Sequence, residues 1–300
     1  MNARKPTLRG IYPPLTTPFA LDGTLALDRL RENIGKYNQT KLTGYVVVGS
    51  TGESVYLREE EKLRVWETVR NAADSTKLLI AGTGQEATAE TIALTQRAAD
   101  LGYRLALVRT PHYFKSQMDD RALERHFRTV ADASPIPILI YSVPQFTGLA
   151  VEALLVARLA EHPNIIGIKE SSGNLERIAQ IIAATPETFS VLVGSASTLY
   201  PSLNLGAGGG ILAAACAWPE LLITLYEAVW QSEHNRARAL QQKVLPAVKL
   251  VTSVYGIAGL KYAMDLRGYY GGPTRLPLLP LENKAQEELA ALVRALEAAS

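Results

Sequence analysis

The sequence contains few of the residues from which covalent cross-links and metal sites are built. Its 300 residues include one cysteine, Cys216, and four histidines, at positions 112, 126, 162 and 234. A single cysteine excludes an internal disulfide, and the histidines lack the close spacing of a metal-binding motif such as HExxH. We therefore expect no metal or other cofactor, and a small buried hydrophobe at Cys216.

An excess of one charge and long apolar runs are also absent. Lys and Arg total 31 against 29 Asp and Glu, and both signs are mixed along the chain. Such a chain lacks the basic patch of a nucleic-acid-binding protein, and no run approaches the ~18 apolar residues of a membrane span. The opening MNARKPTLRG has no signal-peptide core. We expect a cytoplasmic protein that binds neither nucleic acid nor membrane.

The chain instead alternates strand-like runs with stretches of helical periodicity. The strand-like runs are GIYPPLTTPF, GYVVVGS, KLLIAGTG, RLALVRTP, PILIYSVP, IIGIKESS, FSVLVGSA and GGGILAAAC. Eight such units predict an α/β fold, a closed (β/α)8 TIM barrel, with an open doubly wound sheet as the alternative. Helical periodicity continues beyond the eighth unit without a low-complexity linker. We expect a barrel over residues 1–232 and a C-terminal helical extension over 233–300, packed as one structural unit.

A lysine stands near the end of the run IIGIKESS. Alternation places Ile165, Gly167 and Lys169 on one face of this strand and the intervening isoleucines on the other. If those isoleucines pack on helices, Lys169 points into the barrel mouth, where active sites of such barrels lie. An apolar site lowers a lysine pKa and allows the amine to form a Schiff base with a ketone. The alternative is an ion pair with Glu170 or with another acid at the rim of the barrel.

A tyrosine stands near the end of the preceding strand. Tyr141 lies on the same face as Leu139, and adjacent strands are ~4.8 Å apart, so its phenol and the Lys169 amine can reach one ligand. The phenol can move protons while an iminium accepts electrons from a breaking carbon–carbon bond. The alternative is a packing tyrosine with a satisfied hydroxyl.

Two glycine-rich stretches suggest anion binding to different degrees. In VVVGSTGES, backbone N–H groups with the hydroxyls of Ser50 and Thr51 can hold a carboxylate or phosphate, although an ordinary turn is the alternative. In LGAGGGIL, Ile211 occupies the third place of GxGxxG and the segment opens a strand. Dinucleotide binding is therefore not expected.

The segments TTPF, GSTGE, TPHY, YSVPQFTG, GIKESSG and GSAS, in this order, resemble the dihydrodipicolinate synthase / N-acetylneuraminate lyase superfamily. The resemblance implies a (β/α)8 barrel with a C-terminal helical extension, a homotetramer, and a Schiff base with pyruvate or a related 2-oxo acid. It makes Lys169 the Schiff-base lysine and Tyr141 the proton shuttle. Ser50 and Thr51 would bind the substrate carboxylate.

The resemblance extends to further positions around the expected site. Tyr113 in TPHYF matches a tyrosine that, in the superfamily, reaches across a subunit interface into the neighbouring active site. There it would complete a proton relay with Thr51 and Tyr141. The backbone at Ile211 would line the substrate pocket, together with Gly194 of GSAS. Ser171, two residues beyond the lysine, would touch a substrate hydroxyl, unless it caps the next helix.

Two departures from the superfamily pattern bear on the substrate. Dihydrodipicolinate synthases typically have an arginine for the carboxylate of aspartate semialdehyde where this chain has Phe146. Sialic-acid lyases usually have acidic residues after the glycine of GSAS. The block YGIAGLKYAMDLRGYYGGPTRLPL is most similar to 4-hydroxy-2-oxoglutarate aldolase.

We therefore expect a class I aldolase or lyase that cleaves or forms a carbon–carbon bond in a short 2-oxo acid. Its small-molecule partners would be a 2-oxo acid, pyruvate or glyoxylate, and an aldehyde. Dihydrodipicolinate synthase and a sugar-acid dehydratase or aldolase are alternatives within the superfamily. A non-catalytic 2-oxo acid binding protein is a third, although the full set of site residues argues against it.

Overall fold

The computed structural model of the protein describes residues 7–298, and its centre is one parallel sheet of eight strands. Each strand pairs with the next along the chain from β2 to β8, and β1 pairs with β8. A bridge between Pro14 and Val46 joins the segment after β1 to β2 and closes the ring. The strands are β1 (Gly10–Tyr12), β2 (Gly44–Val47), β3 (Leu78–Gly82), β4 (Leu105–Arg109), β5 (Ile138–Ser142), β6 (Ile165–Glu170), β7 (Ser190–Val193) and β8 (Gly209–Ile211). The predicted (β/α)8 barrel is confirmed, and the open sheet is wrong.

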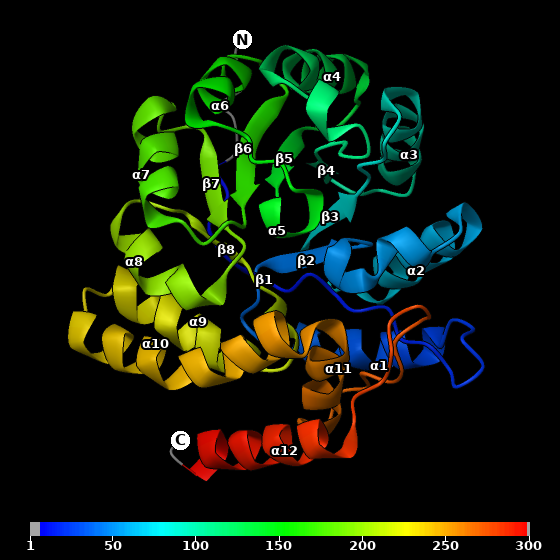
Figure 1. The fold of residues 1–300 in the computed structure, drawn as a ribbon, viewed down its shortest axis with the longest axis vertical. Coiled ribbons are helices and arrows are strands. Elements are labelled where there is room, and N and C mark those ends of the chain that lie inside the picture. The colour runs from blue at the N-terminus through cyan, green and yellow to red at the C-terminus, as the bar shows by residue number, and fades with distance from the viewer. Residues whose placement is uncertain (1–6, 299–300) are drawn as a thin grey trace.

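Helices surround this barrel and continue after it. The barrel helices are α1 (Leu27–Asn38), α2 (Glu59–Ala72), α3 (Thr88–Asp100), α4 (Asp120–Ala133), α6 (Ala153–Ala160), α7 (Leu175–Ala184), α8 (Leu199–Asn204) and α9 (Pro219–Trp230), with a short α5 (Pro144–Thr147) after β5. The chain then forms α10 (His234–Val248), a π-helical turn (Lys249–Val254), α11 (Gly256–Leu266) and α12 (Asn283–Ala298). Figure 1 shows α10, α11 and α12 gathered at one side of the molecule, beside α9. No helix within residues 7–298 is both long and apolar enough to cross a bilayer.

Helix α4 illustrates how the barrel helices cover the strands. Its buried residues Leu123, Phe127 and Val130 recur at helical spacing and form one apolar face. The carboxylate of Asp119 caps the first turn by accepting a hydrogen bond from the Ala122 N–H at 2.8 Å. The apolar face joins a buried cluster with outward-facing residues of β4 and β5, including Ile140. The opposite strand faces are thereby left to line the barrel interior.

The barrel interior is an apolar cluster of alternate strand residues. It contains Leu105 and Leu107 of β4 and Leu139 and Tyr141 of β5. The predicted alternation in β5 is confirmed by this cluster.

The predicted alternation in β6 is wrong at its start. Ile166 lies in the interior cluster, whereas Ile165 packs outside with the helices. The cause is a register shift, because Ile138 pairs with Ile165 but Leu139 pairs with Gly167. Such a bulge reverses the facing of the residues before it and leaves those after it in step.

Candidate active site

Lys169 and Tyr141 lie side by side at the carboxyl ends of β6 and β5. They are Cα partners in the parallel pairing, and both side chains are buried. The Lys169 Nζ lies 4.1 Å from the centroid of the Tyr141 ring. The structure thus brings together the amine and the phenol that the sequence places on neighbouring strands.

The alternative role of Lys169, an ion pair with Glu170, is not formed. The Glu170 carboxylate accepts hydrogen bonds from the Ser172 N–H at 3.0 and 3.1 Å. Among the described residues, no carboxylate lies within 4.0 Å of the Lys169 amine. Burial raises the pKa of Glu170 against the opposing effect of the Ser172 hydrogen bonds.

Cys216 is fully buried near this lysine and does not offer a second nucleophile. Burial raises the pKa of its thiol to about 12, against smaller opposing effects of the Thr16 backbone and the Lys169 charge. The thiol donates a hydrogen bond to the Pro14 carbonyl at 3.3 Å. It therefore stays protonated near neutral pH.

The two hydroxyl residues predicted to bind a carboxylate form the turn after β2. Ser50 and Thr51 begin a 3-10 turn (Ser50–Gly52), and Thr51 is buried. Ser50 lines a small pocket together with Tyr141. Val48, just before the turn, has a positive φ of 61°, a conformation that is strained for a β-branched residue and typical of functional sites.

A buried ion pair connects this turn to the C-terminal helices. The sequence patterns did not predict this contact. Glu53 directly follows the turn, and its carboxylate lies 2.6 Å from the Lys261 Nζ of α11. The same amine donates to the carbonyls of Thr17 and Pro273, each at 2.8 Å. The second Glu53 oxygen accepts from the Arg275 N–H at 2.8 Å. The C-terminal region therefore fixes the conformation of the candidate carboxylate site.

Three other predicted substrate residues lie at the same end of the barrel. Ser171 is buried, and its hydroxyl has no hydrogen-bond partner. It contacts Gly194 so closely that a Cβ at Gly194 would lie 1.7 Å from the Ser171 Oγ. Ile211 ends β8 inside the barrel. Ser171 does not cap α7, because the Asn174 side chain accepts from the Arg177 N–H instead.

Tyr113 is the predicted site residue that the single chain does not bring to the others. Its side chain is 79% exposed on the loop after β4 and packs edge-on against Phe114, with ring centroids 5.1 Å apart. Phe146, on α5, is also exposed. The relay between Tyr113, Thr51 and Tyr141 stays a prediction.

Sequence reasoning also missed Arg109, the last residue of β4. Alternation in RLALVRTP places it on the inner face with Leu105 and Leu107, so a signal was present. Its side chain lines the small pocket of Ser50 and Tyr141.

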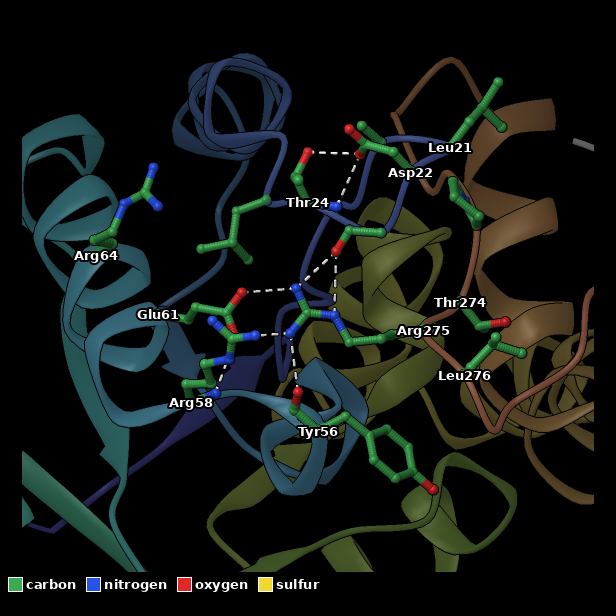
Figure 2. Close-up of a pocket in the computed structure, with 14 residues that line it drawn as sticks. Leu21, Asp22, Thr24, Tyr56, Arg58, Glu61, Arg64, Thr274, Arg275 and Leu276 are labelled. Carbon is green, nitrogen blue, oxygen red and sulfur yellow. Dashed lines mark hydrogen bonds and ion pairs between the residues drawn. The ribbon is translucent and has the colours of Figure 1, made fainter.

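A cavity larger than the pocket of Ser50 and Tyr141 lies elsewhere, between residues 20–25, the start of α2 and residues 273–276. It has a volume of about 600 Å³. Figure 2 shows its centre, where Arg275 binds Glu61 through two contacts of 2.7 Å and donates to the carbonyls of Gly23 and Tyr56. The hydrogen bond from Arg275 lowers the pKa of the Glu61 carboxyl despite its partial burial. These charges are paired with one another, so the cavity is a poorer candidate for catalysis than the barrel mouth.

The sequence model of the Dihydrodipicolinate synthetase family matches residues 7–296. The chain belongs to this family. The dihydrodipicolinate synthetase family is one of class I aldolases and lyases, and the protein is therefore an enzyme of that class.

Individual family members resemble the chain over almost its whole length. It is 38% identical to the 4-hydroxy-tetrahydrodipicolinate synthase of Methanothrix thermoacetophila over 282 residues, 94% of each chain. It is 37% identical to that of Neisseria gonorrhoeae over 289 residues, 96% of this chain and 98% of the relative.

Solved structures of family members have the same fold. Dihydrodipicolinate synthase from Aquifex aeolicus superimposes with a TM-score of 0.92 at 31% identity, covering 97% of this chain and 98% of that one. The chloride-inhibited dihydrodipicolinate synthase of Acinetobacter baumannii, complexed with pyruvate, gives a TM-score of 0.93 at 29% identity. The match covers 97% of this chain and 99% of that one.

Proposed function

We propose that this enzyme forms a Schiff base between Lys169 and pyruvate or a related 2-oxo acid. The observation that carries the proposal is the buried contact between the Lys169 amine and the Tyr141 ring, 4.1 Å from amine to centroid. No carboxylate among the described residues competes for the amine. A neutral amine in such a site can attack the C2 ketone and, after loss of water, leave an iminium.

The neighbouring groups suit the remaining steps. The 2-oxo carboxylate would bind the hydroxyls and backbone N–H groups of Ser50 and Thr51. Tyr141 would take the proton of a C4 hydroxyl while the C3–C4 bond breaks and its electrons move toward the iminium nitrogen. Protonation of the resulting enamine and hydrolysis release the shorter 2-oxo acid, and the reverse sequence joins an aldehyde. The unpartnered hydroxyl of Ser171 is available to the substrate hydroxyl.

The names of the relatives favour one reaction, the synthesis of 4-hydroxy-tetrahydrodipicolinate. The superfamily resemblance makes pyruvate and aspartate semialdehyde its expected substrates. This reaction is our first candidate, in place of the 4-hydroxy-2-oxoglutarate cleavage that the resemblance of the C-terminal block suggests. The aldolase reaction remains the second candidate because of Phe146. A phenylalanine cannot supply the charge-assisted fork that an arginine gives to a substrate carboxylate.

Borohydride reduction in the presence of pyruvate tests the shared chemistry. We expect the intact mass to show a pyruvyl adduct, and peptide mapping to locate this adduct on Lys169. An unmodified Lys169 would refute the proposal. Turnover of pyruvate with aspartate semialdehyde, measured beside cleavage of 4-hydroxy-2-oxoglutarate and dehydration of sugar acids, then separates the candidate reactions. Tyr141→Phe should slow the preferred reaction by about 10²-fold, the scale of a lost general acid or base.

We also propose that the enzyme is a homo-oligomer in which Tyr113 reaches the site of a second copy. The exposed Tyr113 and Phe114 line an apolar depression of about 350 Å³ with Pro111 and Met118. An exposed aromatic pair beside an apolar hollow is typical of a subunit interface. Sedimentation should show a tetramer, and a fully active monomer would contradict this assignment.

A further inference from the structure

Arg109 places a positive charge inside the barrel mouth. Its Cα pairs with that of Tyr141, and its side chain is 15% exposed. The strand is closely packed here, because a Cβ at Gly84 would lie 2.4 Å from the Arg109 backbone nitrogen. A guanidinium keeps its charge at all working pH values, so the site contains a permanent cation.

Arg109 and Tyr141 are neighbours on adjacent strands and line the same small pocket, which also contains Ser50. Burial lowers the pKa of Arg109, whereas the negative charges of Glu86 and of ionised Tyr141 oppose this effect. A cation and a phenolate that share so small a pocket stabilise each other by charge attraction.

Glu86 holds the guanidinium in this position. Its carboxylate lies 3.3 Å from the Arg109 side chain and 2.7 Å from the His112 Nδ1. It also accepts hydrogen bonds from the N–H groups of His112 and Tyr113, at 2.8 and 2.9 Å. Burial alone would raise the pKa of Glu86, but these hydrogen bonds and the neighbouring charges lower it. One ionised carboxylate thus fixes Arg109 and the loop that carries Tyr113.

Few other charged groups face this arrangement. Lys169 lies over the Tyr141 ring from β6, and Lys62 of α2 interacts electrostatically with Arg109. Glu86 and its neighbour His112 face Arg109 from the loops after β3 and β4. The Arg109 Nε is buried without a hydrogen-bond partner. Glu86 therefore leaves one N–H donor of the guanidinium unpaired.

We propose that Arg109 is a positioning residue that stabilises the phenolate of Tyr141 during proton transfer to and from the substrate. The inference rests on the proposed Schiff-base function. With pyruvate bound as the iminium, the C3–H electron pair forms the enamine double bond and the C=N pair moves to nitrogen. The released proton passes to the Tyr141 oxygen, and the reverse step restores the phenolate.

Exchange of the pyruvate C3 hydrogens with deuterium, followed by NMR across pH, tests this step without an aldehyde. Arg109→Leu should reduce exchange about tenfold and move the rising limb of its pH profile up by about one unit, because the Tyr141 phenolate then lacks a neighbouring cation. Arg109→Lys should retain most of the rate. The matched control is Arg104→Leu, an exposed arginine before the same strand, which should leave exchange unchanged.

A double-mutant cycle shows whether the effect passes through the phenol. In a Tyr141→Phe background, Arg109→Leu should lose its effect on the residual exchange. An equal tenfold loss in that background, an unmoved pH limb, or loss of the borohydride adduct in Arg109→Leu would overturn the inference. If the leucine variant does not fold, Arg109→Gln removes the charge with less disturbance of Glu86 and undergoes the same measurements.

The outcome also separates this inference from the proposed function. A wild-type protein that forms no pyruvate adduct on Lys169 would refute both. If the wild-type protein forms the adduct but Arg109→Leu has the same pH profile of exchange as the wild type, only the role of Arg109 is refuted.

Discussion

Replacing Lys261 by methionine should destabilise the protein strongly and weaken 2-oxo acid binding. Lys261 is 1% exposed, and its amine contacts the buried Glu53 carboxylate at 2.6 Å. Removing one partner of a buried pair leaves an uncompensated charge and costs about 3–5 kcal/mol of unfolding free energy. The carbonyls of Thr17 and Pro273 also lose their charged donor.

This loss is large enough to measure by thermal unfolding. At about 2–3 °C per kcal/mol for a domain of this size, the melting temperature should fall by about 6–15 °C. Glu53 follows the Ser50–Thr51 turn directly, so the dissociation constant of pyruvate should rise in the same variant. The two measurements are melting followed by circular dichroism and pyruvate binding followed by calorimetry.

An exposed lysine provides the matched control. Lys41 contacts Glu227 at 2.9 Å but is 78% exposed, so Lys41→Met should cost less than about 1 kcal/mol and leave pyruvate binding unchanged. Lys261→Met combined with Glu53→Gln should recover part of the stability, because the unpaired charge is gone. Equal losses for Lys261→Met and Lys41→Met would show that burial does not increase the contribution of the Glu53–Lys261 pair to stability.

Three further variants test the site and the fold. Lys169→Ala should abolish the borohydride adduct with pyruvate while the melting temperature stays close to that of wild type, and a retained adduct would exclude Lys169 as the nucleophile. Gly194→Ala should clash with the Ser171 Oγ and destabilise the protein by about 1–3 kcal/mol, and Ser171→Gly in the same chain should relieve the loss. Burial lowers the pKa of His126 to about 4, so the unfolded state binds more protons than the folded one between pH ~6.5 and about 4. The free energy of unfolding should therefore fall as the pH decreases through this range. In His126→Asn, the free energy of unfolding from urea titrations should depend less on pH in this range. An unchanged slope of this free energy against pH would contradict the assignment.

The central pair of the candidate site could be predicted because it depends on local patterns. Strand and helix periods specify parallel βα units, and the two-residue repeat of β5 places Tyr141 inside the barrel. The same repeat places Lys169 beside it, despite the wrong facing of Ile165. A one-residue bulge is invisible in the pattern, since isoleucine suits either face.

The surroundings of that pair needed the folded chain. Glu53 and Lys261 come into contact only when α11 packs against the turn after β2. No pattern in either segment predicts this pairing. Arg109 was within reach of the same alternation argument, but its relation to Glu86 depends on how the loops after β3 and β4 fold. The barrel and the amine–phenol pair follow from local periodicity, which is a property of neighbouring residues. The charges around that pair follow from the folded chain, because their contacts join segments that are far apart in the sequence.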